Sequence, residues 1–252
     1  MRLLIAILFS TFIISSCADA SVRHYRLDVV REYPHDTESY TQGLFFHRGQ
    51  MYETTGLRGK STLRKVDIET GEPIKKLDFE KKYFIEGSVV LNDNLYILTW
   101  DSKVAFIYGA DSLDYRSTWK YPREGWGITT DGKYLYASDG SSTIYVFDDK
   151  FSLQRRISVK NMDRPVRWLN ELEFIDGKIW ANVYTTDDIV IINPKDGRVE
   201  GVVDCRGLLP KELHTSDTDV LNGIAYNPQT QKIYLTGKNW ARMYEVKLIE
   251  VK

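Results

Sequence analysis

The stretch WGITTDGKYLYASDG, residues 126–140, contains two short apolar segments on either side of a tight turn. Alternating apolar residues in runs of this length are typical of β-strands, and Asp131-Gly132 supplies the backbone dihedrals that a hairpin turn needs. Four other stretches follow the same pattern, each ending in a second strand that bears Tyr or Trp: QGLFFHRGQMYETTG (42–56), EGSVVLNDNLYILTW (86–100), NELEFIDGKIWANVY (170–184) and NGIAYNPQTQKIYLTG (222–237). The sequence therefore predicts an all-β protein built from a repeated hairpin.

The spacing of these hairpins predicts the architecture. Their first residues stand at 42, 86, 126, 170 and 222, so successive starts are 44, 40, 44 and 52 residues apart. Roughly 40–50 residues is the length of one four-stranded blade of a β-propeller. We therefore expect one five-bladed β-propeller domain over residues 21–252, in which a strand near residues 24–31 completes the last blade. A β-sandwich with accidental spacing is the alternative.

Composition excludes several functional classes. The 252 residues include 34 Lys+Arg and 35 Asp+Glu, so a net charge of −1 provides no general field for nucleic acid. Only Cys17 and Cys205 carry thiols, which is too few for a disulfide framework or a cysteine zinc site. Because a closed propeller hides its strand edges, we expect a monomer.

The N-terminus, MRLLIAILFSTFIISSCADA at residues 1–20, has the pattern of a secretory signal. Its apolar run is shorter than the about 20 residues that span a bilayer. Ile14-Ser15-Ser16-Cys17 also resembles the lipobox of bacterial lipoproteins, which predicts lipidation of Cys17. Ordinary signal cleavage near Ala20 is the alternative. Either interpretation predicts an exported protein, periplasmic or in the cell envelope, that contacts a membrane only through a lipid anchor.

The repeat also predicts where a binding site would form. In a propeller the innermost strands line a central channel, so equivalent positions at their starts converge at one mouth; here these are Gln42, Glu86, Trp126, Asn170 and Asn222. The ends of the second strands should face the same mouth with Glu53, Thr99, Trp100, Ser138, Asp139, Asn182, Tyr184 and Lys238. Amides that donate and accept, walled by indole faces, suit a small ligand bearing a carboxamide or an amine.

Nine short motifs resemble, in order, those of the plant and bacterial glutaminyl-peptide cyclotransferases: Tyr40-Thr41-Gln42-Gly43-Leu44, Tyr52-Glu53-Thr54-Thr55-Gly56, Ile85-Glu86-Gly87-Ser88, Leu98-Thr99-Trp100, Glu124-Gly125-Trp126-Gly127, Leu169-Asn170-Glu171-Leu172-Glu173, Ala181-Asn182-Val183-Tyr184, Leu221-Asn222-Gly223-Ile224-Ala225 and Leu235-Thr236-Gly237-Lys238. The resemblance covers nearly all of residues 24–250. It implies a five-bladed propeller that converts the N-terminal glutamine of peptides or proteins into pyroglutamate and releases ammonia.

The resemblance also implies roles for individual residues. Glu86 matches the catalytic glutamate that shuttles the proton, and Lys238 matches a lysine that stabilises the developing oxyanion. Gln42 and Asn170 match residues that hold the substrate amide, and Trp100 and Trp126 match the walls of the pocket. Glu53 and Glu124 would structure the pocket, with Asn182 and Asn222 behind it. No cofactor or metal is implied for catalysis, although a structural calcium ion in the channel is compatible with the sequence.

Three positions depart from the family pattern, the first being Tyr40, where many members have phenylalanine. Tyr184 stands at a wall position where many members have tryptophan, and Asn239-Trp240 follows Lys238 where members often have Leu-Trp. These departures leave open a non-catalytic propeller that binds peptides or envelope proteins at the same mouth. Another propeller enzyme, a lactonase or a glycosidase, is a weaker alternative, because only Glu86 places a carboxylate at an aligned channel position.

Overall fold

The computed structural model describes residues 21–251, and within them every regular element except one 3₁₀ turn, Lys211–Leu213, is a β-strand. Three sheets are four-stranded antiparallel meanders. These are β2 (Thr41–His47), β3 (Gln50–Thr55), β4 (Thr62–Val66) and β5 (Pro73–Asp78); β6 (Ile85–Leu91), β7 (Asn94–Thr99), β8 (Val104–Gly109) and β9 (Tyr115–Lys120); and β10 (Ile128–Thr130), β11 (Leu135–Ala137), β12 (Thr143–Phe147) and β13 (Leu153–Ser158).

A fourth sheet has eight strands in the order β16-β17-β18-β19-β1-β22-β21-β20. Its strands are β16 (Leu169–Ile175), β17 (Lys178–Val183), β18 (Asp188–Ile192), β19 (Val199–Asp204), β1 (Arg23–Pro34), β22 (Arg242–Val251), β21 (Lys232–Gly237) and β20 (Leu221–Asn227). Two antiparallel meanders meet in it, because Arg23–Arg26 of β1 pair in parallel with Gly201–Asp204 of β19. The strand expected near residues 24–31 is β1, which pairs antiparallel with β22 and so joins the two ends of the chain.

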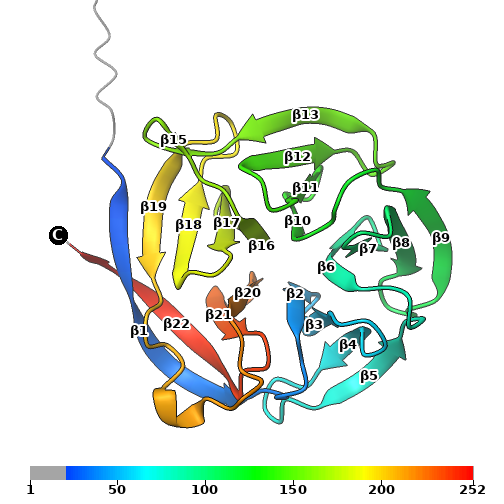
Figure 1. Ribbon diagram of the computed structural model, residues 1–252, viewed down its shortest axis with the longest axis horizontal. Coiled ribbons are helices and arrows are strands. Elements are labelled where there is room, and N and C mark those ends of the chain that lie inside the picture. The colour runs from blue at the N-terminus through cyan, green and yellow to red at the C-terminus, as the bar shows by residue number, and fades with distance from the viewer. Residues whose placement is uncertain (1–20, 252) are drawn as a thin grey trace, which may run out of the picture.

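The sheets stand around a common axis, with β2, β6, β10, β16 and β20 innermost and β5, β9, β13 and β19 at the periphery (Figure 1). Each innermost strand contacts its two neighbours, so the five strands form a closed ring. The connection between β13 and β16 contains a small hairpin of β14 (Lys160–Asn161) and β15 (Arg164–Pro165). Within residues 21–251, no helix is long and apolar enough to cross a membrane. Residues 1–20, with Cys17, lie outside the described part of the chain.

The aromatic residue of each repeated hairpin fills the space between neighbouring sheets. The five side chains are at most 6% exposed, and each belongs to a different apolar cluster: Tyr52, Tyr96, Tyr136, Trp180 and Tyr234. Burial of a large apolar side chain stabilises a fold by roughly 1.5–3 kcal/mol. The aromatic residue that recurs in the repeat therefore marks five equivalent layers of apolar packing between neighbouring sheets.

Glycine allows the innermost strands to approach one another. A Cβ built on Gly127 would lie 2.1 Å from the carbonyl oxygen of Asn170, and one on Gly87 would lie 2.7 Å from that of Trp126. The Gly87 amide instead donates to the Trp126 carbonyl at 2.7 Å. At each close approach, the residue just before the glycine is held at the same height along the central axis as its counterpart on the neighbouring strand. Glu86 and Trp126 are such residues.

At the corresponding position of β16 the chain has Glu171 in place of glycine. Its carboxylate accepts the backbone N–H groups of Ile224 at 2.9 Å and Leu44 at 3.4 Å, which belong to β20 and β2. Two residues on, Glu173 accepts the Tyr226 N–H at 2.9 Å. Burial raises the pKa of Glu171 well above its ordinary value and that of Glu173 to about 8. These two carboxyl groups are structural, since they link three innermost strands.

The close approach of the strands is tested by Gly127→Ala. The added methyl group meets backbone atoms that cannot rotate away, so we expect a loss of about 3 kcal/mol in the free energy of unfolding. Gly132→Ala is the control, because nothing lies within 4 Å of its Cβ and only its left-handed backbone opposes the change, at roughly 1 kcal/mol. Urea unfolding measures both. Equal losses in the two variants would contradict the proposed constraint.

Candidate functional site

A cavity of about 280 Å³ opens at the axis where the innermost strands begin. It is lined by Tyr40, Gln42, Phe84, Glu86, Trp100, Trp126, Trp168, Asn170, Tyr184 and Lys238. This is slightly below the roughly 300–1,000 Å³ of pockets for drug-sized ligands, which suits a single amino-acid residue. The structure thus brings together seven of the residues predicted from the sequence: Gln42, Glu86, Trp100, Trp126, Asn170, Tyr184 and Lys238.

Six of the lining residues stand at one of two positions relative to the strands. Gln42, Glu86 and Asn170 are each the second residue of an innermost strand. Trp100, Tyr184 and Lys238 are each the first residue after a second strand, β7, β17 and β21 respectively. The three lining residues that sequence reasoning missed are Tyr40, Phe84 and Trp168. Each lies two positions before a predicted residue, and because side chains two apart share a face of a strand, this repeat position was the available signal.

Glu86 is the one acidic residue of the lining, and its side chain is 4% exposed. Burial raises its pKa well above the ordinary value, the charge of Lys238 opposes the rise, and the charge of Glu124 adds to it. No hydrogen bond within residues 21–251 contributes to the shift. Glu86 therefore differs from Glu171 and Glu173, whose carboxylates are occupied by backbone donors, and is free to exchange a proton with a ligand.

Lys238 lines the same cavity as Glu86 with 3% of its surface exposed, close enough for the two charges to act on each other. Its ammonium lies over the rings of Tyr40, 4.7 Å from the centroid, and Tyr184, at 4.9 Å. Burial lowers the pKa of Lys238, whereas the charges of Glu86 and Asp219 raise it. The hydroxyl of Tyr40 donates to Asp219 at 2.7 Å, which fixes the ring. Tyr184, the departure from the family pattern, thus provides an aromatic face for the lysine.

Glu124 fixes the two indole walls. Its Oε2 atom accepts the N–H of Trp100 at 3.0 Å and that of Trp126 at 3.3 Å. The Trp126 ring also meets Tyr184 edge to face, with centroids 5.6 Å apart. Gly140 makes room for it, since a Cβ there would lie 2.6 Å from the indole. Both walls are therefore rigid before a ligand binds.

The amides divide into a lining pair and a supporting pair. Asn170 lines the cavity, and its buried Oδ1 atom has no hydrogen-bond partner among the described residues. Gln42 lines it as well, held through Oε1 by the side chain of Asn222 at 3.2 Å. Asn222 and Asn182 do not reach the cavity lining; the Asn182 side chain accepts the N–H of Gly223 at 3.0 Å. The Asn170 side chain therefore brings to the cavity wall a buried acceptor that the described residues leave unsatisfied.

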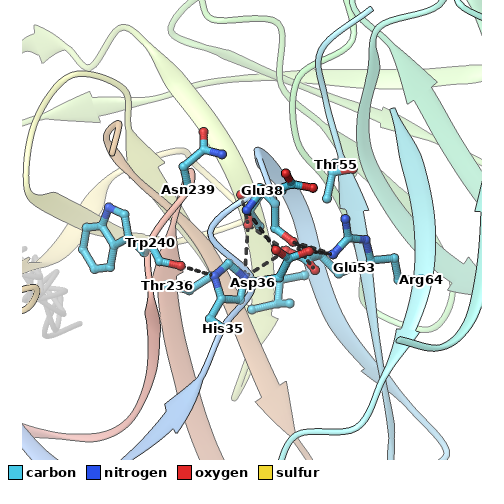
Figure 2. Close-up of polar contacts among 12 residues, drawn as sticks. His35, Asp36, Glu38, Glu53, Thr55, Arg64, Thr236, Asn239 and Trp240 are labelled. Carbon is cyan, nitrogen blue, oxygen red and sulfur yellow. Dashed lines mark hydrogen bonds and ion pairs between the residues drawn. The ribbon is translucent and has the colours of Figure 1, made fainter. Parts of the chain in front are cut away.

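Glu53 lies outside the lining, in the buried polar network of Figure 2. It accepts from His35 at 3.0 Å and from Thr41 at 2.7 Å. The other ring nitrogen of His35 bonds to the carbonyl of Trp240 at 2.7 Å. Arg64 completes the network by donating to Asp36 at 2.6 Å. Glu53 thus supports the cavity without contacting it, because its network connects the segment before β2 to the loop after Lys238.

The loop that carries Lys238 is held by its unusual sequence. Asn239 has a left-handed backbone with φ of 59°, a conformation that asparagine adopts more readily than leucine. Its side chain donates to the Thr37 carbonyl at 2.7 Å and its backbone N–H to the Ser39 carbonyl at 2.8 Å. The Trp240 indole donates to the Asp219 carbonyl at 2.8 Å. The departure at Asn239 is therefore accommodated by contacts that fix the loop.

The thiol of Cys205 is not part of the site. It is 3% exposed, in an apolar cluster, and burial raises its pKa.

The Glu53–His35 pair should make stability depend on pH in a specific way. Burial raises the pKa of Glu53, but the charge and hydrogen bond of His35 outweigh this effect, so the net pKa of Glu53 is lowered. Burial lowers the pKa of His35, but the charge and hydrogen bond of Glu53 outweigh it, so the net pKa of His35 is raised. The lowered Glu53 pKa contributes stability above about pH 4.5 that is lost on acidification, and the raised His35 pKa contributes stability below about pH 6.5 that is lost as pH rises through the folded value.

Glu53→Gln should therefore reduce the free energy of unfolding by about 3 kcal/mol between pH 4.5 and 6.5, and by less at pH 3.5 and pH 9. Urea unfolding at the three pH values measures this difference. Glu69→Gln is the control, since its ion pair with Arg31 is more than half exposed and solvent-exposed pairs contribute little to stability. A loss that does not vary with pH would contradict an ion pair.

Comparison with known proteins identifies the family. The model of the glutamine cyclotransferase family matches residues 3–248. The chain is 41% identical to the glutaminyl-peptide cyclotransferase of Arabidopsis thaliana over 242 residues, 92% of this chain and 74% of the plant protein. Among solved structures, Myxococcus xanthus glutaminyl cyclase superposes with a TM-score of 0.86 at 33% identity, covering 92% of this chain and all of that one. This chain is a member of the glutamine cyclotransferase family.

Proposed function

We propose that the cavity converts the N-terminal glutamine of a peptide or protein into pyroglutamate and releases ammonia. The observation that carries the proposal is the buried Glu86 carboxyl, which has no hydrogen-bond donor within residues 21–251 and lines one cavity with a lysine, two amides and the tryptophan walls. The family match and the two similar proteins support the same activity.

The first contribution of the site is proximity. Cyclisation joins the α-amine nitrogen of the substrate to its own γ-carbonyl carbon, so the extended side chain must fold back and lose its rotamers. Trp100 and Trp126, held by Glu124, restrict that side chain. Asn170 offers Oδ1 to the carboxamide N–H, and Gln42 is fixed beside it by Asn222.

The second contribution is proton transfer. The Glu86 carboxylate takes a proton from the attacking amine as the new C–N bond forms. The carboxyl then gives this proton to the amide nitrogen as the bond from the γ-carbonyl carbon breaks, and ammonia leaves. A carboxyl whose pKa is raised by burial is suited to both steps, because it binds a proton more strongly than an exposed carboxylate does and can still release it.

The third contribution is electrostatic. Negative charge develops on the γ-carbonyl oxygen when the amine attacks, and the buried ammonium of Lys238 is placed to stabilise it. The same charge limits the rise in the pKa of Glu86. Lys238 therefore keeps Glu86 ionisable as well as stabilising the oxyanion.

We also propose that the fold is a five-bladed β-propeller. If the eight-stranded sheet is divided at the parallel pairing of β1 with β19, five four-stranded blades surround the axis. A crystal structure would test this count.

We further propose that residues 1–20 direct export, that Cys17 carries a lipid anchor in the cell envelope, and that the domain over residues 21–252 acts as a monomer. Fatty-acid labelling abolished by Cys17→Ser would support the anchor.

We propose that catalysis needs no cofactor. Within residues 21–251, no group of three or more His, Cys, Asp or Glu side chains is placed to hold a metal ion. A calcium ion with a structural role, coordinated by oxygens of the channel, is compatible with this chemistry. A chelator should accordingly leave the rate unchanged.

Ammonia release from a peptide that begins with Gln tests the activity. We expect release from this peptide, with or without chelator, and none from the same peptide beginning with Asn, whose ring would be one atom smaller. Glu86→Gln should lower kcat/KM by roughly 10²–10⁴-fold. Its unfolding midpoint should not fall, because the change removes a buried carboxyl that lacks a donor. A folded wild-type protein without activity would favour a peptide-binding propeller, and full activity in Glu86→Gln would overturn the mechanism.

Glu124→Gln separates the charge of Glu124 from its hydrogen bonds. The Gln oxygen can still accept from both indoles, but the charge that raises the pKa of Glu86 is gone. The acid limb of kcat/KM should therefore move to lower pH, whereas ionisation of the substrate amine is unaffected. Asp101→Asn is the control, because Asp101 pairs with Arg58 at the rim and should leave the limb unchanged. A limb that does not move, or moves upward, would contradict Glu86 as its origin.

A further inference from the structure

Trp168 stands apart from the other lining residues, because 55% of its surface is exposed. It lies two positions before Asn170, as Tyr40 and Phe84 lie before Gln42 and Glu86. Tyr40 and Phe84 are partly buried and pack against each other, with ring centroids 6.2 Å apart. Trp168 is therefore the most exposed residue of the cavity lining, ahead of Trp100 at 37%, and lies at its solvent-facing edge.

The backbone of Trp168 is held in a costly conformation. Its φ is 65°, in the left-handed region that a bulky side chain rarely adopts. Among the other left-handed residues, Leu113 and Phe151 pack into apolar clusters that offset the cost. Trp168 has no comparable burial. Met162 shares this conformation at 79% exposure without lining the cavity, so the place of Trp168 on the cavity wall, and not its backbone conformation, is what points to a ligand.

Backbone hydrogen bonds on both sides of Trp168 fix its main chain. The Trp168 N–H donates to the Gly140 carbonyl at 2.8 Å, and the Trp168 carbonyl accepts from the Tyr184 N–H at 2.8 Å. The indole is inclined by 34° to that of Trp126, with centroids 6.2 Å apart. The pocket wall thus continues outward as a second aromatic surface that is ordered before a ligand arrives.

We infer that Trp168 is the binding subsite for the residue that follows the N-terminal glutamine, and that it favours an aromatic side chain there. This inference rests on the proposed function, since it assigns the position of the glutamine to the inner cavity. Stacking on a fixed indole should raise kcat/KM for a Gln-Phe peptide about 3- to 10-fold over a Gln-Ala peptide.

The test compares ammonia release from Gln-Phe-Ala and Gln-Ala-Ala for the wild type and two variants. Trp168→Asn removes the indole but keeps a residue that tolerates the left-handed backbone, and should abolish the preference for Phe. Trp168→Phe should retain part of it. Met162→Asn is the matched control, because Met162 is 79% exposed and has a φ of 53°, but it does not line the cavity; its preference should equal that of the wild type. Trp168→Gly replaces the Asn variant if that protein does not fold.

A preference that survives in Trp168→Asn, or an equal loss for both peptides, would overturn the subsite. The binding of pyroglutamyl-Phe-Ala and pyroglutamyl-Ala-Ala, measured by calorimetry, keeps this result separate from the proposed function. If the wild type releases no ammonia, the proposed activity fails, and binding alone decides the subsite. Tighter binding of the Phe product that disappears in Trp168→Asn supports it, and equal binding of both products contradicts it.

Discussion

The close approach of the innermost strands is the constraint on which the site depends. Glycine at positions such as 87 and 127 lets backbone meet backbone, and the residues immediately before these glycines are held at one level of the axis. Side chains from strands far apart in sequence therefore converge without any loop having to fold over them. The aromatic layers between sheets keep the ring closed and make this convergence rigid.

Buried carboxyl groups in this protein fall into two kinds. Glu171 and Glu173 accept backbone N–H groups of neighbouring strands, and Glu53 is paired with His35, so their burial is compensated by the protein itself. Glu86 is equally buried, but its partners are the charges of Lys238 and Glu124 rather than donors. An uncompensated buried carboxyl destabilises a fold, and its retention at the mouth of a cavity is best explained by chemistry with a ligand.

Much of this arrangement could be predicted from the sequence, because a repeat places equivalent positions together. The spacing of the hairpins identified the strands, the aromatic layers and the convergence of Gln42, Glu86, Trp126 and Asn170. The aromatic residues two positions earlier were not predicted to line the site, because they stand before the repeated hairpins, outside the two sets of positions that were compared. Trp168 was hidden further by lying in a connection that has no regular pattern.

Other positions could not be predicted from the sequence. Glu53 was assigned to the pocket by its strand, but its contacts are with His35 and Thr41, which no periodicity reveals. Asn182 lies within β17 rather than after its end, so it supports a neighbouring strand instead of lining the cavity. The role of Glu124 as a common acceptor for two indoles likewise depends on tertiary contacts.

The central claim is that Glu86 is the group whose ionisation governs the reaction, and a direct titration of its carboxyl tests this best. Infrared difference spectra between the wild type and Glu86→Gln, recorded as a function of pH, isolate the signal of the protonated carboxyl. The account predicts that Glu86 stays protonated well above the ordinary glutamate pKa of 4.5, and that its midpoint in the free enzyme coincides with the acid limb of kcat/KM. A carboxyl that ionises near its ordinary value, or at a pH unrelated to that limb, would contradict it.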